Sequence, residues 1–429
     1  MKHIISILLL VTAIFVGAAQ RPVNSPTAGS VDSRAAVASA GLPGIAALPP
    51  TADTTVWLMN IYPGVEPYQL EGHTALLVQI KNRPTRAYNF GVFDFDSPNF
   101  TWRFVSGQTD YMAVVWPYDA LIEEYARDGR RAVAHRIDFD AAQKARLLHD
   151  LDSIVRPENR LYRYNYVKDN CATRPLAAIE RATGDSIRLG LPPFAANSAQ
   201  PLTFRNIMRY YHRNYPWYQF GIDLALGSGI DYPLNSREAT FAPVEMDAML
   251  PTAVVGCAKD STAEGERLLS DCSIAVIDLP ADYAVEPPTP WYLTPMAVFC
   301  ALLLFTILLT IRDLRRRRTT RWFDAVFYGI LGLAGCLLTF LIFVSSHEAT
   351  SPNWLYLWLN PLCLLVPTLI WLKKCKKVLF CYQTLNFAVL LLLCALWPLL
   401  PQSANPAFLP IITSEIIRSG AYIYLNRKQ

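Results

Sequence analysis

The sequence predicts an α+β domain exported from the cytoplasm, followed by an all-α membrane domain of five spans. Three observations predict this organisation. The 429 residues exceed the usual size of one domain, an apolar segment stands at the N-terminus, and the composition changes from mixed polar to strongly apolar near Trp291. We therefore expect domains at residues 51–285 and 286–429.

Residues 1–19 have the layout of a secretory signal sequence. Two polar residues precede the apolar stretch 4–16, and small residues follow it up to Ala19. This stretch is short for a membrane span, so we expect a signal that is cleaved after Ala19, with an uncleaved anchor as the alternative. Residues 20–50 are rich in Ala, Ser, Pro and Gly, which is typical of a disordered linker.

The C-terminal third contains five apolar segments long enough to cross a bilayer. They are residues 291–311, 322–344, 354–372, 378–400 and 408–425. Clusters of Lys and Arg follow the first, third and fifth segments, whereas the loops 345–353 and 401–407 contain neither residue. Because basic loops stay in the cytoplasm, we expect an inner-membrane protein with residues 21–290 in the periplasm and a cytoplasmic C-terminus.

Cysteine positions then single out one thiol. Six of the nine cysteines lie in or beside the apolar segments, and only Cys171, Cys257 and Cys272 are expected outside the cytoplasm. Cys257 and Cys272 flank a polar stretch between two strand-like runs, so a disulfide between them is the natural pairing in an oxidising compartment. Cys171 is then unpaired, and is either reactive or simply buried.

The surroundings of Cys171 favour a nucleophile. Residues 172–183 have helical periodicity, and Asp169 or Asn170 is a plausible N-cap, so the thiol stands in the first helical turn. The helix dipole and free N–H groups there lower a thiol pKa and can hold an oxyanion. The alternative is a small apolar residue packed at a strand-to-helix junction.

His73 is the candidate base. It precedes the apolar run 75–80, and a turn centred on Arg83 and Pro84 leads into a second strand over residues 86–95. This register places His73 opposite Asp94, whose carboxylate would fix the imidazole tautomer, and points Asn89 to the other face. A single bulge would transfer that role to Asn89 or Asp96. The other external histidines, His135, His149 and His212, lack such surroundings in the sequence.

Four motifs in order carry a family resemblance. They are GHTA at 72–75, YNFGVFDF at 88–95, RPENR at 156–160 and DNCATRP at 169–175. Histidine before cysteine resembles the circularly permuted branch of the NlpC/P60 papain-like superfamily. More specifically, the motifs resemble the N-terminal periplasmic domain of a lipoprotein N-acyltransferase family from Bacteroidota.

The resemblance implies transfer of an acyl chain from a phospholipid to the α-amino group of the diacylglyceryl-cysteine of a lipoprotein. Cys171 would form a thioester, with His73 as base and Asp94 as its orienting partner. The oxyanion would be held by Asn170, Tyr166 or the Cys171 N–H, and Asn89 is a further candidate lining residue. No cofactor or metal ion is implied, and the mild excess of 39 basic over 35 acidic residues does not suggest a nucleic-acid partner.

Two other functions remain open from the sequence. A membrane-anchored cysteine amidase or endopeptidase of peptidoglycan would use the same Cys171 and His73, and an inactive scaffold or sensor would use neither. Five spans favour a lipid substrate, because a single helix is sufficient for an anchor. Within the fifth span, Glu415 and Arg418 are expected to pair with each other, since isolated charges are costly there.

Overall fold

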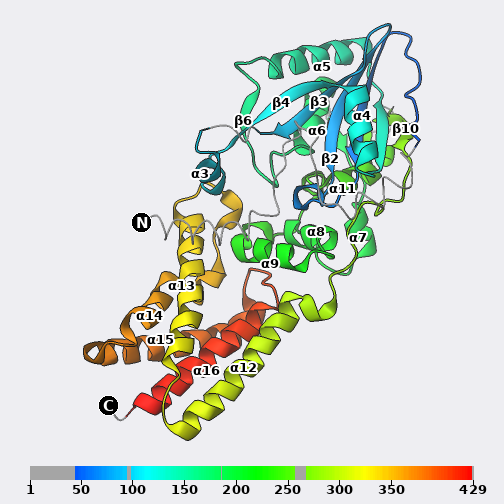
Figure 1. The fold of residues 1–429 in the computed structure, drawn as a ribbon. Coiled ribbons are helices and arrows are strands. Elements are labelled where there is room, and N and C mark those ends of the chain that lie inside the picture. Colours follow the sequence, from blue (N-terminus) through cyan, green and yellow to red (C-terminus); the bar gives the residue numbers. More distant parts are fainter. Residues whose placement is uncertain (1–43, 94–97, 185, 257–266, 428–429) are drawn as a thin grey trace.

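A seven-stranded antiparallel sheet is the centre of the N-terminal domain (Figure 1). The computed structural model describes residues 44–93, 98–184, 186–256 and 267–427. The strands follow the order β10-β5-β1-β2-β3-β4-β6. Their bounds are β1 (Thr54–Ile61), β2 (His73–Ile80), β3 (Arg86–Val92), β4 (Asp110–Pro117), β5 (Ala132–Ile137), β6 (Leu161–Arg163) and β10 (Ser270–Ile277). A small sheet joins β7 (Ser186–Arg188), β8 (Val254–Gly256) and β9 (Arg267–Leu268).

Helices cover both faces of the large sheet because its strands alternate apolar side chains on the two sides. Val56 and Leu58 of β1 pack in one core with α5 (Ala141–Ile154) and α6 (Thr173–Thr183). Trp57 and Met59 pack in a second core with α4 (Tyr118–Arg127). The predicted helix at 172–183 is therefore confirmed as α6, which packs beside the sheet.

Short helices connect the sheet domain to the helical domain (Figure 1). They are α3 (Phe100–Val105), α7 (Pro193–Asn197), α8 (Phe204–Tyr211), α9 (Pro216–Ala225), α10 (Ser236–Ala239) and α11 (Pro243–Met249). On α9, the ring of Trp217 lies 5.8 Å from Phe299, and that of Phe220 lies 4.9 Å from Phe408. Arg209 of α8 also donates to Ser403. These contacts dock the two domains directly on each other.

The hairpin of β2 and β3 has a different register from the predicted one. Ala75 pairs with Asn89 and Val78 pairs with Arg86, so the turn is centred on Asn82, which has a left-handed φ of 58°. An odd shift in register exchanges the faces of a strand. Asn89 therefore shares a face with His73, and the predicted register of this hairpin was wrong.

Several predictions fall on residues outside the described ranges. The signal sequence, Asp94 itself and Cys257 are among them. Cys272 carries a free thiol, so the structure does not support the predicted disulfide. The end of the predicted linker is described: Ile45 forms a bridge with Ile277 of β10 and the Ala46 N–H donates to the Val276 carbonyl, so this segment is held at the sheet although most of its residues are exposed.

The helical domain contains three helices long and apolar enough to span a membrane, within the described residues. They are α12 (Pro295–Arg316), α13 (Arg321–Phe343) and the segment around α15 (Lys376–Leu396). The third expected span is divided into η7 (Trp354–Leu357), η8 (Pro361–Leu364) and α14 (Leu365–Leu369), because Pro361 cannot continue a helix that precedes it. The fifth, α16 (Phe408–Asn426), is a helix that contains Glu415 and Arg418.

Glu415 and Arg418 do not pair with each other, which corrects the sequence prediction. Arg418 donates instead to Asp313 at 2.9 Å and to Asp324 at 2.6 Å, and Glu415 accepts from Asn386 at 2.9 Å. The two carboxylates come from the adjacent ends of α12 and α13, which the bundle brings against α16. Tertiary packing thus supplies closer partners than the neighbouring turn of the same helix.

Candidate thiol and imidazole site

Cys171 stands immediately before α6 and is half-buried. The preceding residue fixes this position: Asn170 Oδ1 accepts from the N–H groups of Ala172 and Thr173 at 2.9 and 3.0 Å. The Asn170 amide nitrogen donates to the carbonyls of Tyr166 and Phe241, both at 2.9 Å. Its amide is therefore fully used in capping the helix and fixing the loop, and is not free to hold an oxyanion.

Two hydrogen-bond donors affect the ionisation of the Cys171 thiol. Hydrogen bonding to the Thr74 N–H and to the Tyr164 hydroxyl lowers the pKa of the thiol. Burial nevertheless raises the pKa of the thiol to about 11, because the two hydrogen bonds offset only part of its desolvation. The helix terminus thus does not lower the thiol pKa as predicted, and Cys171 is a neutral thiol at pH 7.

Strand β2, which carries Thr74, also brings His73 to this site. It is the first residue of β2, next to Thr74, and its Nε2 lies 3.2 Å from Asn89 Oδ1. Since the amide oxygen accepts a hydrogen bond, it favours the tautomer with hydrogen on Nε2 and a lone pair on Nδ1. Burial, with a smaller effect of the Arg130 charge, lowers the pKa of His73 to about 4, so the imidazole is neutral at pH 7.

Gly91 allows β3 to approach the thiol closely. Its φ is +85°, and a Cβ at this position would lie 3.3 Å from the Tyr164 ring and 3.4 Å from the Cys171 Cβ. A side chain there would therefore be strained and would crowd the site. This glycine lies inside the YNFGVFDF motif, where an isolated glycine in a strand already indicates a close backbone approach.

Tyr166 has a partner other than an oxyanion. Its hydroxyl donates to Glu71 at 2.5 Å, and the same carboxylate lies 2.7 Å from His212 Nε2. Burial opposes ionisation of Glu71, but the interactions with His212 and Tyr166 outweigh it and lower its pKa. This network fixes the loop before Cys171. No sequence pattern indicates Glu71 as the partner of His212, because 141 residues separate them.

Arg130 is a second residue that sequence reasoning missed. Only 3% of it is exposed; its Nε donates to the Tyr62 carbonyl at 2.9 Å, and its guanidinium lies over the Tyr125 ring. Among the described residues Arg130 forms no salt bridge and its Nη2 has no hydrogen-bond partner. Its buried positive charge lies near His73, with Asp128 as an acidic group close enough to favour the charged guanidinium. No pattern in the sequence marks Arg130.

Residues 47–210 match the family model described as the Lnb N-terminal periplasmic domain, and residues 288–429 match the Lnb transmembrane domain. The chain belongs to the Lnb family. The predicted family is thus confirmed, and the chain is a membrane protein with a periplasmic domain. The Lnb domains indicate a membrane-associated protein that modifies lipoproteins. No curated protein and no solved structure matches the chain, so the permuted NlpC/P60 fold stays a prediction.

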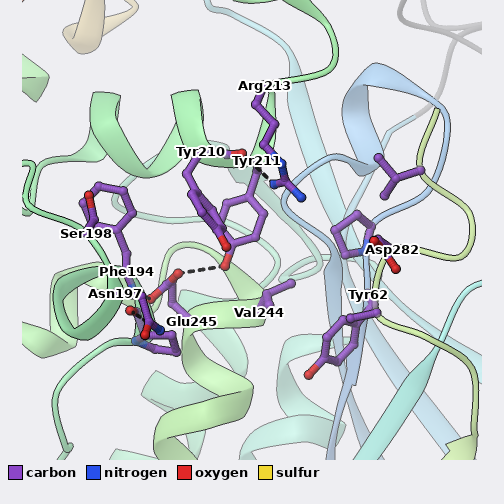
Figure 2. A pocket seen from close by; sticks show the side chains of 14 residues that line it. Tyr62, Phe194, Asn197, Ser198, Tyr210, Tyr211, Arg213, Val244, Glu245 and Asp282 are labelled. Atoms are coloured by element: carbon purple, nitrogen blue, oxygen red, sulfur yellow. Dashed lines mark hydrogen bonds between the residues drawn. The ribbon is translucent and has the colours of Figure 1, made fainter. Parts of the chain in front are cut away.

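A cavity of about 190 Å³ lies elsewhere in the periplasmic domain (Figure 2). Aromatic side chains including Tyr62, Phe194 and Tyr211 line it, and Tyr211 donates to Glu245 at 2.7 Å. Neither Cys171 nor His73 is among its lining residues. Within the described residues no group of three or more His, Cys, Asp or Glu side chains is arranged to hold a metal ion.

Proposed function

We propose that the protein is a lipoprotein N-acyltransferase that carries the acyl chain of a phospholipid on Cys171 and transfers it to the α-amino group of diacylglyceryl-cysteine. Family membership supports the reaction class. For this chain, the proposal rests on the contact between the membrane domain and the loop 164–172, which contains Cys171. Glu348 lies 2.9 Å from Lys168 and 3.3 Å from Asn165.

A second set of contacts, made by the loop 345–353 that follows α13, supports a lipid substrate. Ser346 donates to the carbonyls of Ser106 and Gly107, and His347 Nε2 lies 3.0 Å from the Phe104 carbonyl. The loop after α13 therefore contacts both α3 and the segment before Cys171. A thiol at this boundary is within reach of ester bonds at the bilayer surface, whereas a peptidoglycan hydrolase has no need of such contacts.

The two shifted pKa values favour proton transfer that accompanies nucleophilic attack. At pH 7 the resting pair is a neutral thiol and a neutral imidazole. His73 Nδ1 takes the thiol proton as sulfur attacks the ester carbonyl. The tetrahedral intermediate expels the glycerol oxygen, which takes that proton from His73. The products are a Cys171 thioester and a lysophospholipid.

The second half of the reaction reverses these roles. The lipoprotein amine attacks the thioester carbonyl while His73 accepts a proton from its nitrogen. The new amide forms as the carbon–sulfur bond breaks, and the departing sulfur takes the proton back from His73. In this proposal the Tyr164 hydroxyl and the Thr74 N–H stabilise negative charge on sulfur or oxygen, because both already lie at the thiol.

Asn89 takes the orienting role in this proposal, since it contacts His73 from the same face. Asp94 remains a candidate from the sequence and lies outside the described residues. We further propose five spans, an inner-membrane location and a cytoplasmic C-terminus, on the strength of the basic clusters that follow the first, third and fifth apolar segments.

The test is the mass of lipoprotein N-terminal peptides from cells in which this protein is the only candidate N-acyltransferase. Cys171→Ser and His73→Ala should leave peptides that lack the amide-linked chain. Cys272→Ser is the matched control, because Cys272 is a free, half-buried thiol of the same domain. Complete N-acylation in the Cys171→Ser strain would refute the proposal, and release of muropeptides by purified protein would favour the hydrolase.

A further inference from the structure

A row of aromatic side chains runs from the Cys171 thiol to the membrane domain. The Tyr164 ring lies 4.2 Å from Tyr111, and Tyr111 lies 5.1 Å from Phe93. Phe93 then stacks on Phe100 at 5.7 Å, and Phe100 on Phe104 at 5.8 Å. The members come from β4, α3, the residue that follows β3 and the loop before Cys171, so only the tertiary structure assembles them.

The first member of the row lies beside the thiol residue. A Cβ at Gly91 would be 3.3 Å from the Tyr164 ring and 3.4 Å from the Cys171 Cβ, so both residues border the space that this glycine leaves open. Tyr111, Phe93, Tyr164 and Phe104 are half-buried, as is Cys171 itself, whereas Phe100 is buried. The rings of the half-buried members therefore expose apolar surface, whereas the rings of a core cluster would be fully buried.

The last members lie against the membrane domain. On α3, next to Phe104 in the same turn, Trp102 is 60% exposed and its ring lies 5.3 Å from Phe340 near the C-terminal end of α13. Figure 1 shows α3 beside this end of α13. Aromatic side chains that are partly exposed to water are typical of the interface between a bilayer and water. The row thus ends on the helix that contacts this end of α13 and the loop after it.

We propose that this aromatic row is the binding surface for the acyl chain of the donor phospholipid. The inference rests on the proposed function, and it adds the path that the chain follows. The ester carbonyl lies at Cys171, the first methylene groups lie along Tyr111 and Phe93, and the chain end lies at Phe100, Phe104 and α13. An acyl chain that crossed polar surface would expose every methylene group to water, so an apolar path from the bilayer to the thiol lowers the cost of bringing the ester there.

The direct test uses the full-length protein in nanodiscs with phosphatidylethanolamine that carries a photoreactive diazirine on one acyl chain. A diazirine near the carbonyl should crosslink to Tyr111 or Phe93, and one near the chain end to Phe100, Phe104 or Phe340. Crosslinks confined to the cavity beside Tyr211, or to membrane helices without α3, would overturn the proposed path.

Photolysis of Cys171→Ser protein separates this inference from the proposed function. Binding of the chain does not need the thiol, so the variant should give the same crosslinks. If wild-type protein forms no thioester while the crosslinks follow the row, the proposed reaction fails and the lipid path stands. If a thioester forms and the crosslinks lie elsewhere, the path fails and the reaction stands.

Substitutions give a second, independent measure. Phe93→Ala should lower the rate of Cys171 acylation by a hexadecanoyl donor about tenfold, relative to the rate with a water-soluble butanoyl ester. Phe305→Ala is the matched control, because Phe305 is a 47% exposed aromatic residue of α12 that lies outside the row. An equal loss with both donors would indicate that Phe93 only supports the fold, and would count against the path.

Discussion

The Arg130 charge contributes to the low proton affinity of His73, and replacing Arg130 with methionine should change the pH dependence of acyl transfer. The pKa of His73 lies at about 4 instead of 6.5, with burial as the larger cause and the Arg130 charge as the second. Removal of the charge should therefore recover less than half of this shift, about one pH unit. The neutral imidazole would then be lost below about pH 5 rather than about pH 4.

The expected effect on rate follows from the fraction of neutral imidazole. His73 acts as a base only when unprotonated, so activity is present above its pKa and is lost as the pH falls through it. Arg130→Met should be close to wild type at pH 7, about twofold slower at pH 5 and about fivefold slower at pH 4. The assay is the pH profile of kcat/KM for Cys171 acylation in detergent, normalised to the plateau near pH 7.

Two variants control for structural damage. Arg130→Lys keeps the charge and should keep the low-pH limb near its original position. Arg131→Met removes the adjacent cation, which faces Asp278 at the surface, and should shift nothing. If Arg130→Met melts at the wild-type temperature and the low-pH limb of its kcat/KM profile does not move, Arg130 does not lower the pKa of His73.

Three other substitutions test the described contacts. Asn170→Ala removes a helix cap and leaves buried carbonyls unsatisfied, so it should destabilise the protein by about 2–3 kcal/mol; an unchanged melting temperature in detergent would contradict this. Asn89→Ala should slow acylation about tenfold or more by freeing the His73 ring, and a wild-type rate would exclude the orienting role. Arg418→Met leaves Asp313 and Asp324 as buried, unpaired carboxylates and should cost about 3–5 kcal/mol, visible as a lower melting temperature that Arg418→Lys partly restores.

Local patterns in the sequence predicted the elements that present the site. The helical spacing after Cys171 became α6, the apolar run after His73 became β2, and both lie within residues 47–210, which match the Lnb N-terminal periplasmic domain. Periodicity and capping depend on neighbouring residues, which is why they are legible in one sequence. Hydropathy likewise indicated a membrane domain, but it did not distinguish continuous spans from the broken segment that contains Pro361.

The partners of the candidate residues came only from the fold. A left-handed Asn82 set the hairpin register and gave His73 the amide of Asn89, and Arg130 reached the site from the loop before β5. Burial then raised the thiol pKa that the helix terminus was expected to lower. The sequence by itself determined the family, the two-domain organisation and the candidate Cys171 and His73, because these follow from composition and local motifs. Register, burial and long-range contacts depend on residues far apart in the chain, and for that reason only the tertiary structure decided the charge states and partners of the two side chains.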